Sequence, residues 1–193
     1  PIGKLTNIAL AIKKEPKIVD KIRVVWLGSN YPTPGEYNLD NDTTSVNPVI
    51  ESGVEFEMVT VRYGEPSGTA AVTVTREEVN AKLKGKGPES QTPVTGRHGG
   101  TFTCFGDYSA NLFEHAEMHG NPPSRALFDM AAVAVVKNPQ WAEKKVIPAP
   151  ALRGIDWIEK PDNPRKIVIW ENFNRDTIVN DLFDLILKSN PEK

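Results

Sequence analysis

Hydrophobic residues follow helix-like and strand-like spacings in turn along the first part of the chain. Apolar side chains three and four positions apart predict an amphipathic helix over residues 5–14, and an apolar, β-branched run predicts a strand over 22–27. A second helix is predicted over 43–51, where Gly53 ends it, and a second strand over 54–61. This α-β-α-β order indicates parallel strands joined by right-handed crossovers.

The pattern weakens after the second predicted strand. Gly, Pro and Ser cluster around one short predicted helix, REEVNAKL, over residues 76–83. We interpret residues 62–105 as a loop-rich excursion, a lid or a small subdomain, within a single domain that spans residues 1–193.

Regular patterns return in the last part of the chain. We expect the second of two consecutive helices to be buried, because its interior is almost entirely apolar. The predicted elements are helices over 107–119 and 124–138, strands over 144–152, near Trp157 and over 165–173, and a helix over 175–188. Together the elements predict a three-layer α/β fold, with a mostly parallel sheet flanked by helices.

The first residues form a loop that leads directly into a helix, without an initiator Met. An α/β domain normally has a strand before such a helix. We therefore expect further strands upstream of Pro1, missing from this chain or present on another chain.

Composition narrows the classes of partner. A chain of 193 residues can bury a core without staples. Its 23 basic and 25 acidic side chains give a net charge of −2, which argues against nucleic-acid binding. Cys104 is the only cysteine, so an intrachain disulfide is excluded and a cysteine-based zinc site is not expected. No apolar run approaches the roughly 20 residues of a membrane helix, and the compartment stays undetermined.

Asp129 is the most informative single residue, because it lies in the apolar run RALFDMAAVAVV. A carboxylate there would have a large desolvation cost unless it is paired, hydrogen-bonded or bound to a metal ion. Two readings stay open: an ion pair with Arg125, one predicted helical turn earlier, or a role in ligand binding.

Glu36 and Asn38 follow the first strand, where open α/β sheets bind their ligands. In one reading they belong to an ordinary polar turn after Pro34 and Gly35. In the other, Glu-x-Asn places a carboxylate and an amide on the same side of an extended segment, a geometry suited to two hydroxyl groups.

The histidines are candidates for acid–base chemistry. His115 and His119 lie four apart on a predicted helix, which favours a solvated face over a metal site. His98, beside Arg97 on the Gly-flanked loop TGRHGG, is the better candidate. The sequence contains no phosphate-binding Gly-rich motif after a strand and no G-x-S-x-G elbow, so nucleotide-driven and acyl-transfer chemistry are poorly supported.

Several stretches together carry a family resemblance over nearly the whole chain. The segments PIGKLTNIALAIKKEPKIVDKI, VVWLGSN, EYNLDND, SGVEFEMV and FDMAAVAVVKNP resemble the C-terminal two thirds of the nucleoside hydrolase family, the calcium-dependent N-ribosidases of inosine-uridine preferring type. The resemblance implies the α/β fold of that family. It also places the family's first strand and its D-x-D-x-x-x-D-D loop upstream of Pro1.

The resemblance implies roles for five positions. Glu36 and Asn38 would hold the ribose hydroxyls, together with Asn30 in an Asn-x5-Glu-x-Asn pattern, although the stretch before Asn30 is shorter than in a typical member. Asp129 matches a buried Asp that binds calcium and a ribose hydroxyl, and Ile2 matches a backbone carbonyl ligand of the same ion.

The chain departs from the family at the leaving-group position. Phe128 stands where many purine-cleaving members have a His that is proposed to protonate the base. The loop over 94–108 would then contribute His98, Phe105 or Tyr108 to leaving-group recognition. The general base that activates the water would come from the upstream aspartate loop.

Three functional hypotheses follow. The first is an N-glycoside hydrolase that uses a calcium-bound water on a nucleoside or related glycoside, through an oxocarbenium-like transition state. The second is a sugar-binding relative without turnover. The third is a structural piece whose open sheet edges need an N-terminal partner. None involves nucleic acid or a membrane, and a homo-oligomer remains an option.

Overall fold

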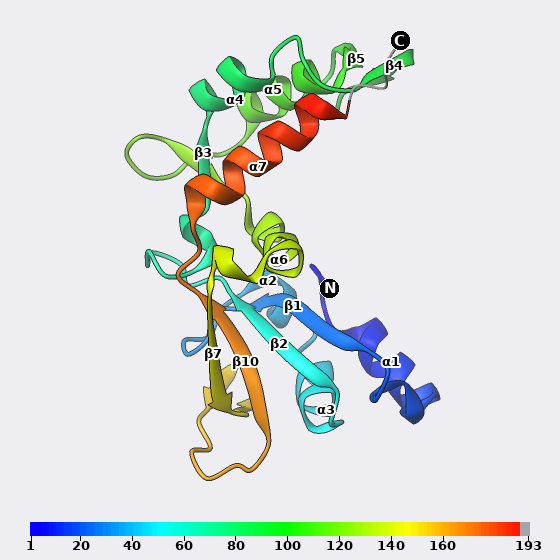
Figure 1. Cartoon of the computed structure of the whole chain (residues 1–193), viewed down its shortest axis with the longest axis vertical. Coiled ribbons are helices and arrows are strands. Elements are labelled where there is room, and N and C mark those ends of the chain that lie inside the picture. Colours follow the sequence, from blue (N-terminus) through cyan, green and yellow to red (C-terminus); the bar gives the residue numbers. More distant parts are fainter. Residues whose placement is uncertain (190–193) are drawn as a thin grey trace. The chain divides into compact units, whose positions relative to one another are not determined.

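The computed structural model describes residues 1–189, which form two compact units (Figure 1). We call residues 1–72 and 128–174 the sheet unit, and the described residues 73–127 and 175–189 the helical unit. No helix in the described part of the chain is both long and apolar enough to cross a membrane.

A four-stranded sheet in the order β1-β2-β10-β7 forms the centre of the sheet unit. Its strands are β1 (Arg23–Ser29), β2 (Glu55–Thr60), β10 (Lys166–Glu171) and β7 (Glu143–Pro148). The first three are parallel to one another and β7 is antiparallel to β10. The prediction of a mostly parallel α/β sheet is therefore confirmed.

The main core lies between one face of this sheet and the helices α1 (Thr6–Lys14) and α3 (Val46–Glu51). Alternate strand residues point to this face, as the two-residue period of a strand requires. The core members from β1, β2, β10 and α3 are Val24, Trp26, Phe56, Met58, Ile167, Ile169, Val46, Val49 and Ile50. Ile8, Ala9 and Ile12 of α1 pack against them, which accounts for the helical spacing in the sequence.

Helix α6 (Phe128–Lys137) packs on β1 and buries Ala131, Ala132, Ala134 and Val135. The expectation of a wholly buried helix is wrong, because Val133 is 62% exposed and Val136 is 55% exposed. Alanines and Val135 fill the packed side of α6, and Val133 and Val136 extend from the other side.

Shorter elements complete the sheet unit. Helix α2 (Tyr37–Asp40) lies between the first predicted strand and the second predicted helix, where the sequence predicted no helix. The predicted strand 144–152 divides in two, because β7 ends at Pro148 and β8 (Ala151–Arg153) pairs with β9 (Asp156–Ile158). The 3-10 turns are η1 (Pro16–Ile18), η2 (Thr43–Ser45), η3 (Thr69–Ala71) and η4 (Pro139–Trp141).

Three helices and two small sheets make up the helical unit. The helices are α4 (Arg76–Leu83), α5 (Phe105–His115) and α7 (Arg175–Lys188), which Figure 1 shows alongside one another. Strand β3 (Thr73–Thr75) pairs with β6 (Ser124–Ala126), and β4 (Glu89–Thr95) pairs with β5 (Thr101–Cys104).

Three predicted features of this region are wrong. The helix expected over 124–138 begins only at Phe128, because residues 124–126 pair with β3 instead. The helix expected over 107–119 ends at His115, and His119 forms a β-bridge with Ser124. Residues 89–95 and 101–104 form a hairpin rather than a loop. In each case strand or bridge pairing overrides the expected local pattern, with a distant segment for residues 124–126 and with a neighbouring segment in the other two cases.

Candidate functional site

Glu36 lies at the carboxyl edge of the sheet and is only 4% exposed. Its backbone is extended, and its Oε2 accepts hydrogen bonds from the N–H groups of Asn38, at 2.8 Å, and Leu39, at 3.0 Å. The carboxylate therefore caps the first turn of α2. Burial raises the pKa of Glu36, the two backbone N–H groups oppose this, and the charges of Asp40 and Asp129 raise it further.

Asn38 is the second residue of α2 and is half-buried. Its Nδ2 donates to the carbonyl of Leu27 in β1, at 3.0 Å. The expected extended Glu-x-Asn segment is therefore wrong, since the chain turns into a helix directly after Glu36. The cap and the bond to β1 fix both side chains at the end of the strand.

Asp129 lies in the first turn of α6, and burial of its carboxyl group raises its pKa. More than a third of the residue is nevertheless exposed, so the expectation of a buried aspartate is wrong. Among the described residues its carboxylate has no hydrogen-bond or ion-pair partner. Its charge raises the pKa of Glu36, so the two carboxylates are close enough to interact.

The helical ion pair between Arg125 and Asp129 that the sequence suggested has no geometric basis. Arg125 belongs to β6, so the two residues do not lie one turn apart on a helix. The Arg125 Nη1 instead donates to the Glu117 carbonyl at 3.4 Å.

The N-terminal segment that carries Ile2 lies along β1. The Pro1 carbonyl accepts from Leu27 N at 3.0 Å, and the Gly3 carbonyl accepts from Trp26 Nε1 at 2.8 Å. Gly28 permits this arrangement, because a Cβ there would lie 2.0 Å from the Trp26 indole. Ile2 itself is 53% exposed.

The side chain of Asn30 is engaged within its own loop. Its Oδ1 accepts from Tyr63 N at 3.0 Å, and its Nδ2 donates to Thr33 Oγ1 at 2.8 Å and to the Pro34 carbonyl at 3.0 Å. These bonds give Asn30 a role in shaping the loop that leads to Glu36. A role in binding sugar stays a prediction.

Phe128 is half-buried directly before Asp129 and contacts an aromatic residue that the sequence analysis missed. Its ring lies 5.9 Å from that of Tyr63, at 75°, and Tyr63 is 49% exposed. The signal in the sequence was the position of Tyr63 directly beyond the second predicted strand, at the ligand-binding edge of an α/β sheet.

The other predicted leaving-group residues belong to the helical unit. His98 stacks on His115, with ring centroids 4.6 Å apart. Tyr108 stacks on Phe102, and its Oη accepts from Arg97 N at 3.3 Å. Phe105 is 46% exposed and lines a pocket of about 210 Å³ together with Tyr108. Their predicted role toward a leaving group stays a prediction.

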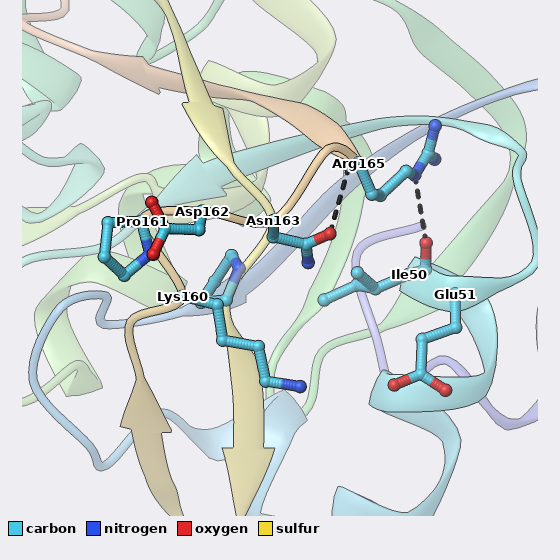
Figure 2. Close-up of a pocket in the computed structure, with 8 residues that line it drawn as sticks. Ile50, Glu51, Lys160, Pro161, Asp162, Asn163 and Arg165 are labelled. Carbon is cyan, nitrogen blue, oxygen red and sulfur yellow. Dashed lines mark hydrogen bonds between the residues drawn. The ribbon is translucent and has the colours of Figure 1, made fainter.

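A pocket of about 530 Å³ lies at the opposite, amino edge of the sheet (Figure 2). Arg165 points from the start of β10 towards the end of α3, where its Nε donates to the Ile50 carbonyl at 3.2 Å. Asn163 Oδ1 accepts from Arg165 N at 3.0 Å, and its Nδ2 donates to the Ala149 carbonyl at 2.8 Å. These groups are occupied in holding the fold.

The oxygen ligands at the carboxyl edge are of the kind that a hard cation such as calcium prefers. Calcium takes oxygen ligands from carboxylates and backbone carbonyls, and Asp129 offers a carboxylate that bonds to none of the described residues. A cation beside Asp129 would also offset the repulsion between Asp129 and Glu36. The described residues contain no group of three or more His, Cys, Asp or Glu side chains arranged to hold a metal ion.

The chain has an α/β fold, and the carboxylates of Glu36 and Asp129 lie at the carboxyl ends of its strands. The sequence model described as inosine-uridine preferring nucleoside hydrolase matches residues 1–180. The chain therefore belongs to the inosine-uridine preferring nucleoside hydrolase family.

One curated relative and several solved structures are similar to this chain. The pyrimidine-specific ribonucleoside hydrolase RihB of Escherichia coli is 37% identical over 65 residues, which are 31% of this chain and 21% of that protein. The purine-preferring ribonucleoside hydrolase of Gardnerella vaginalis has 19% identity and a TM-score of 0.73, over 98% of this chain and 60% of that one. A plant nucleoside hydrolase has 16% identity and a TM-score of 0.72, over 96% and 60%. The chain thus spans about 60% of the solved chains that it matches.

Proposed function

We propose that this chain carries the sugar-binding part of an enzyme that hydrolyses the N-glycosidic bond of a nucleoside or a related glycoside. The supporting observation is the pair of carboxylates at the carboxyl edge, Glu36 and Asp129, whose pKa values are both raised. Membership of the nucleoside hydrolase family supports the reaction class.

In this proposal the residues around Glu36 bind the ribose. The Oε2 of Glu36 is committed to the first turn of α2, so its second oxygen accepts a sugar hydroxyl. Asn38 is anchored to β1 through Nδ2, which leaves its Oδ1 as the acceptor for a neighbouring hydroxyl. Carboxylate and amide oxygens suit two adjacent hydroxyl donors.

Asp129 and the Ile2 carbonyl would hold a calcium ion, and Asp129 would also accept a ribose hydroxyl. Such an ion, when bound, supplies a water of lowered pKa to the reaction. The Phe128 ring carries no ionisable proton, so in this site it contributes packing against the leaving base rather than proton transfer. His98, Phe105 and Tyr108 remain the candidates for the leaving-group acid and its surroundings.

Calcium titration by isothermal calorimetry, with and without ribose, tests the metal assignment. We expect calcium binding that is coupled to ribose binding, and we expect Asp129→Ala to abolish it. Asp162→Ala is the matched control, because Asp162 is an exposed aspartate at the amino edge of the same unit. Unchanged calcium affinity in Asp129→Ala would overturn the assignment.

Release of free base from inosine and uridine tests the reaction. Hydrolysis that depends on Glu36 and Asp129 supports the proposal. Ribose binding without release of base from any nucleoside tested would favour the alternative of a sugar-binding relative without turnover.

A further inference from the structure

Arg62 has an unusual backbone conformation directly beyond β2. Its φ is 49°, in the left-handed region that residues other than glycine seldom adopt. Such a conformation is strained and persists only where the surroundings enforce it. The next residue, Tyr63, donates its N–H to Asn30 Oδ1 at 3.0 Å, so this turn is linked to the loop after β1.

The guanidinium of Arg62 joins the segments that follow three strands. Nε donates to the Tyr31 carbonyl after β1 at 3.2 Å, and Nη1 donates to Ser67 Oγ after β2 at 3.1 Å. Nη2 pairs with Glu171 Oε2, at the end of β10, at 2.6 Å. The Arg62 side chain is 12% exposed and that of Glu171 is 11% exposed, so the pair is largely removed from water.

Further bonds extend this network towards Glu36. The Ser67 carbonyl accepts from Asn172 N at 2.7 Å, which ties the segments after β2 and β10 together. On the other side, the Asn30 side chain accepts from Tyr63 N–H and donates to Thr33 Oγ1 and to the Pro34 carbonyl. Pro34 lies two residues before Glu36.

The fold alone does not require this arrangement. Glycine would adopt the left-handed conformation at position 62 without strain. Buried ion pairs of this kind are weak evidence for stability, because desolvation offsets most of the attraction. Strain and a buried ion pair occur together where the loops of the proposed sugar site meet, which is typical of a preorganised binding site.

We propose that Arg62 is a positioning residue. By bonding to the segments after β1 and β2 and to the end of β10, it holds the 30–38 loop in the shape that presents Glu36 and Asn38 to the ligand. The proposal rests on the proposed function for the identity of the ligand. Its mechanical part, the ordering of the loop, does not depend on the ligand.

The test compares Arg62→Lys with Arg165→Lys in the full chain. Lysine keeps the charge but cannot reach the three acceptors at once. Arg165 is a matched control, since it also donates to backbone carbonyls, those of Ile50 and Val54, but at the amino edge of the same sheet. Hydrogen exchange of the Asn38 and Leu39 amides reports the loop, and calorimetry with inosine, uridine and ribose, each with calcium present, reports binding.

We expect Arg62→Lys to accelerate exchange at both amides and to weaken binding of these probes at least about tenfold, as loss of an outer-shell partner does at other sites. Arg165→Lys should leave both readouts unchanged even where it lowers the unfolding midpoint. Unchanged exchange in Arg62→Lys, or an equal effect in both variants, would overturn the proposal. If the unmodified chain binds none of the probes, the proposed function fails, and exchange alone still decides the role of Arg62.

Discussion

The two edges of the sheet in the sheet unit differ in how their charged and polar side chains are partnered. At the amino edge, Arg165 and Asn163 have neighbouring backbone groups as partners. At the carboxyl edge, burial raises the pKa values of Glu36 and Asp129, and the charge of Asp129 acts on Glu36. The comparison teaches that one end of a sheet can be optimised for stability while the other end keeps carboxylates whose charge is not fully compensated. A bound ligand would compensate the charge at that other end.

The largest effect on stability is expected from Arg165→Ala, at the amino edge. The carbonyls of Ile50 and Val54 lose their donor, and each buried acceptor left without a partner costs about 1–3 kcal/mol. We expect the free energy of unfolding, measured by urea denaturation, to fall by about 2–6 kcal/mol. A loss well below this range would mean that water replaces the guanidinium as the donor to these carbonyls. A change in nucleoside binding would contradict the contrast, because the amino edge would then also affect the ligand.

Glu36→Ala should have the next largest effect. The variant removes the cap of α2, which costs about 1 kcal/mol, but it also removes a buried carboxylate whose pKa is raised. The net loss of unfolding free energy should therefore stay near or below about 1 kcal/mol, while ribose binding is lost. Glu36→Gln is the control, since its amide oxygen can keep the cap without the charge. Retained ribose affinity in Glu36→Ala would remove this edge from the proposed site.

Elements whose signals are local could be predicted from the sequence. Helix α7 has the predicted bounds, and α4 begins at a Thr75–Glu78 capping box in which each side chain bonds to the backbone of the other residue. The parallel sheet also followed from local patterns, because each apolar run carries its own two-residue or 3.6-residue period.

The parts that depend on contacts distant in sequence could not be predicted. The residue order of Glu36 and Asn38 pointed correctly to the edge of the sheet, but the position of the Asn38 side chain depends on its bond to the Leu27 carbonyl of β1. Strand β6 exists because of its pairing with β3. Arg62 lies beyond an ordinary strand, and its role is visible only when three strand ends are brought together.

Asp129→Asn should have a smaller effect of the opposite sign. A carboxyl group whose folded-state pKa is raised favours the folded state below its ordinary pKa and loses that advantage as the pH rises through the raised value. The variant should therefore match the unmodified chain at low pH and exceed it above the raised pKa. Because Asp129 is exposed, the gain should stay below about 1 kcal/mol.

Urea denaturation between pH 3 and pH 8, without divalent cations, measures this difference. Asp162→Asn is the control, since it removes a comparable exposed charge from the amino edge. A loss of stability in Asp129→Asn at neutral pH would show that the carboxylate has a stabilising role, and the contrast between the edges would then fail.

The smallest effect is expected from Tyr37→Ala, between Glu36 and Asn38. The Tyr37 side chain is 75% exposed. Asn41 Nδ2 donates a hydrogen bond to the Tyr37 backbone carbonyl at 2.7 Å, and the substitution keeps this carbonyl. We expect the unfolding free energy to change by less than about 0.5 kcal/mol and inosine affinity to stay within about twofold. Tyr63→Ala, which removes the ring packed against Phe128, should weaken inosine binding more. A severalfold loss of inosine affinity in Tyr37→Ala with unchanged stability would mean that the binding surface extends along α2. The contrast between the two edges would then also include exposed side chains of this helix.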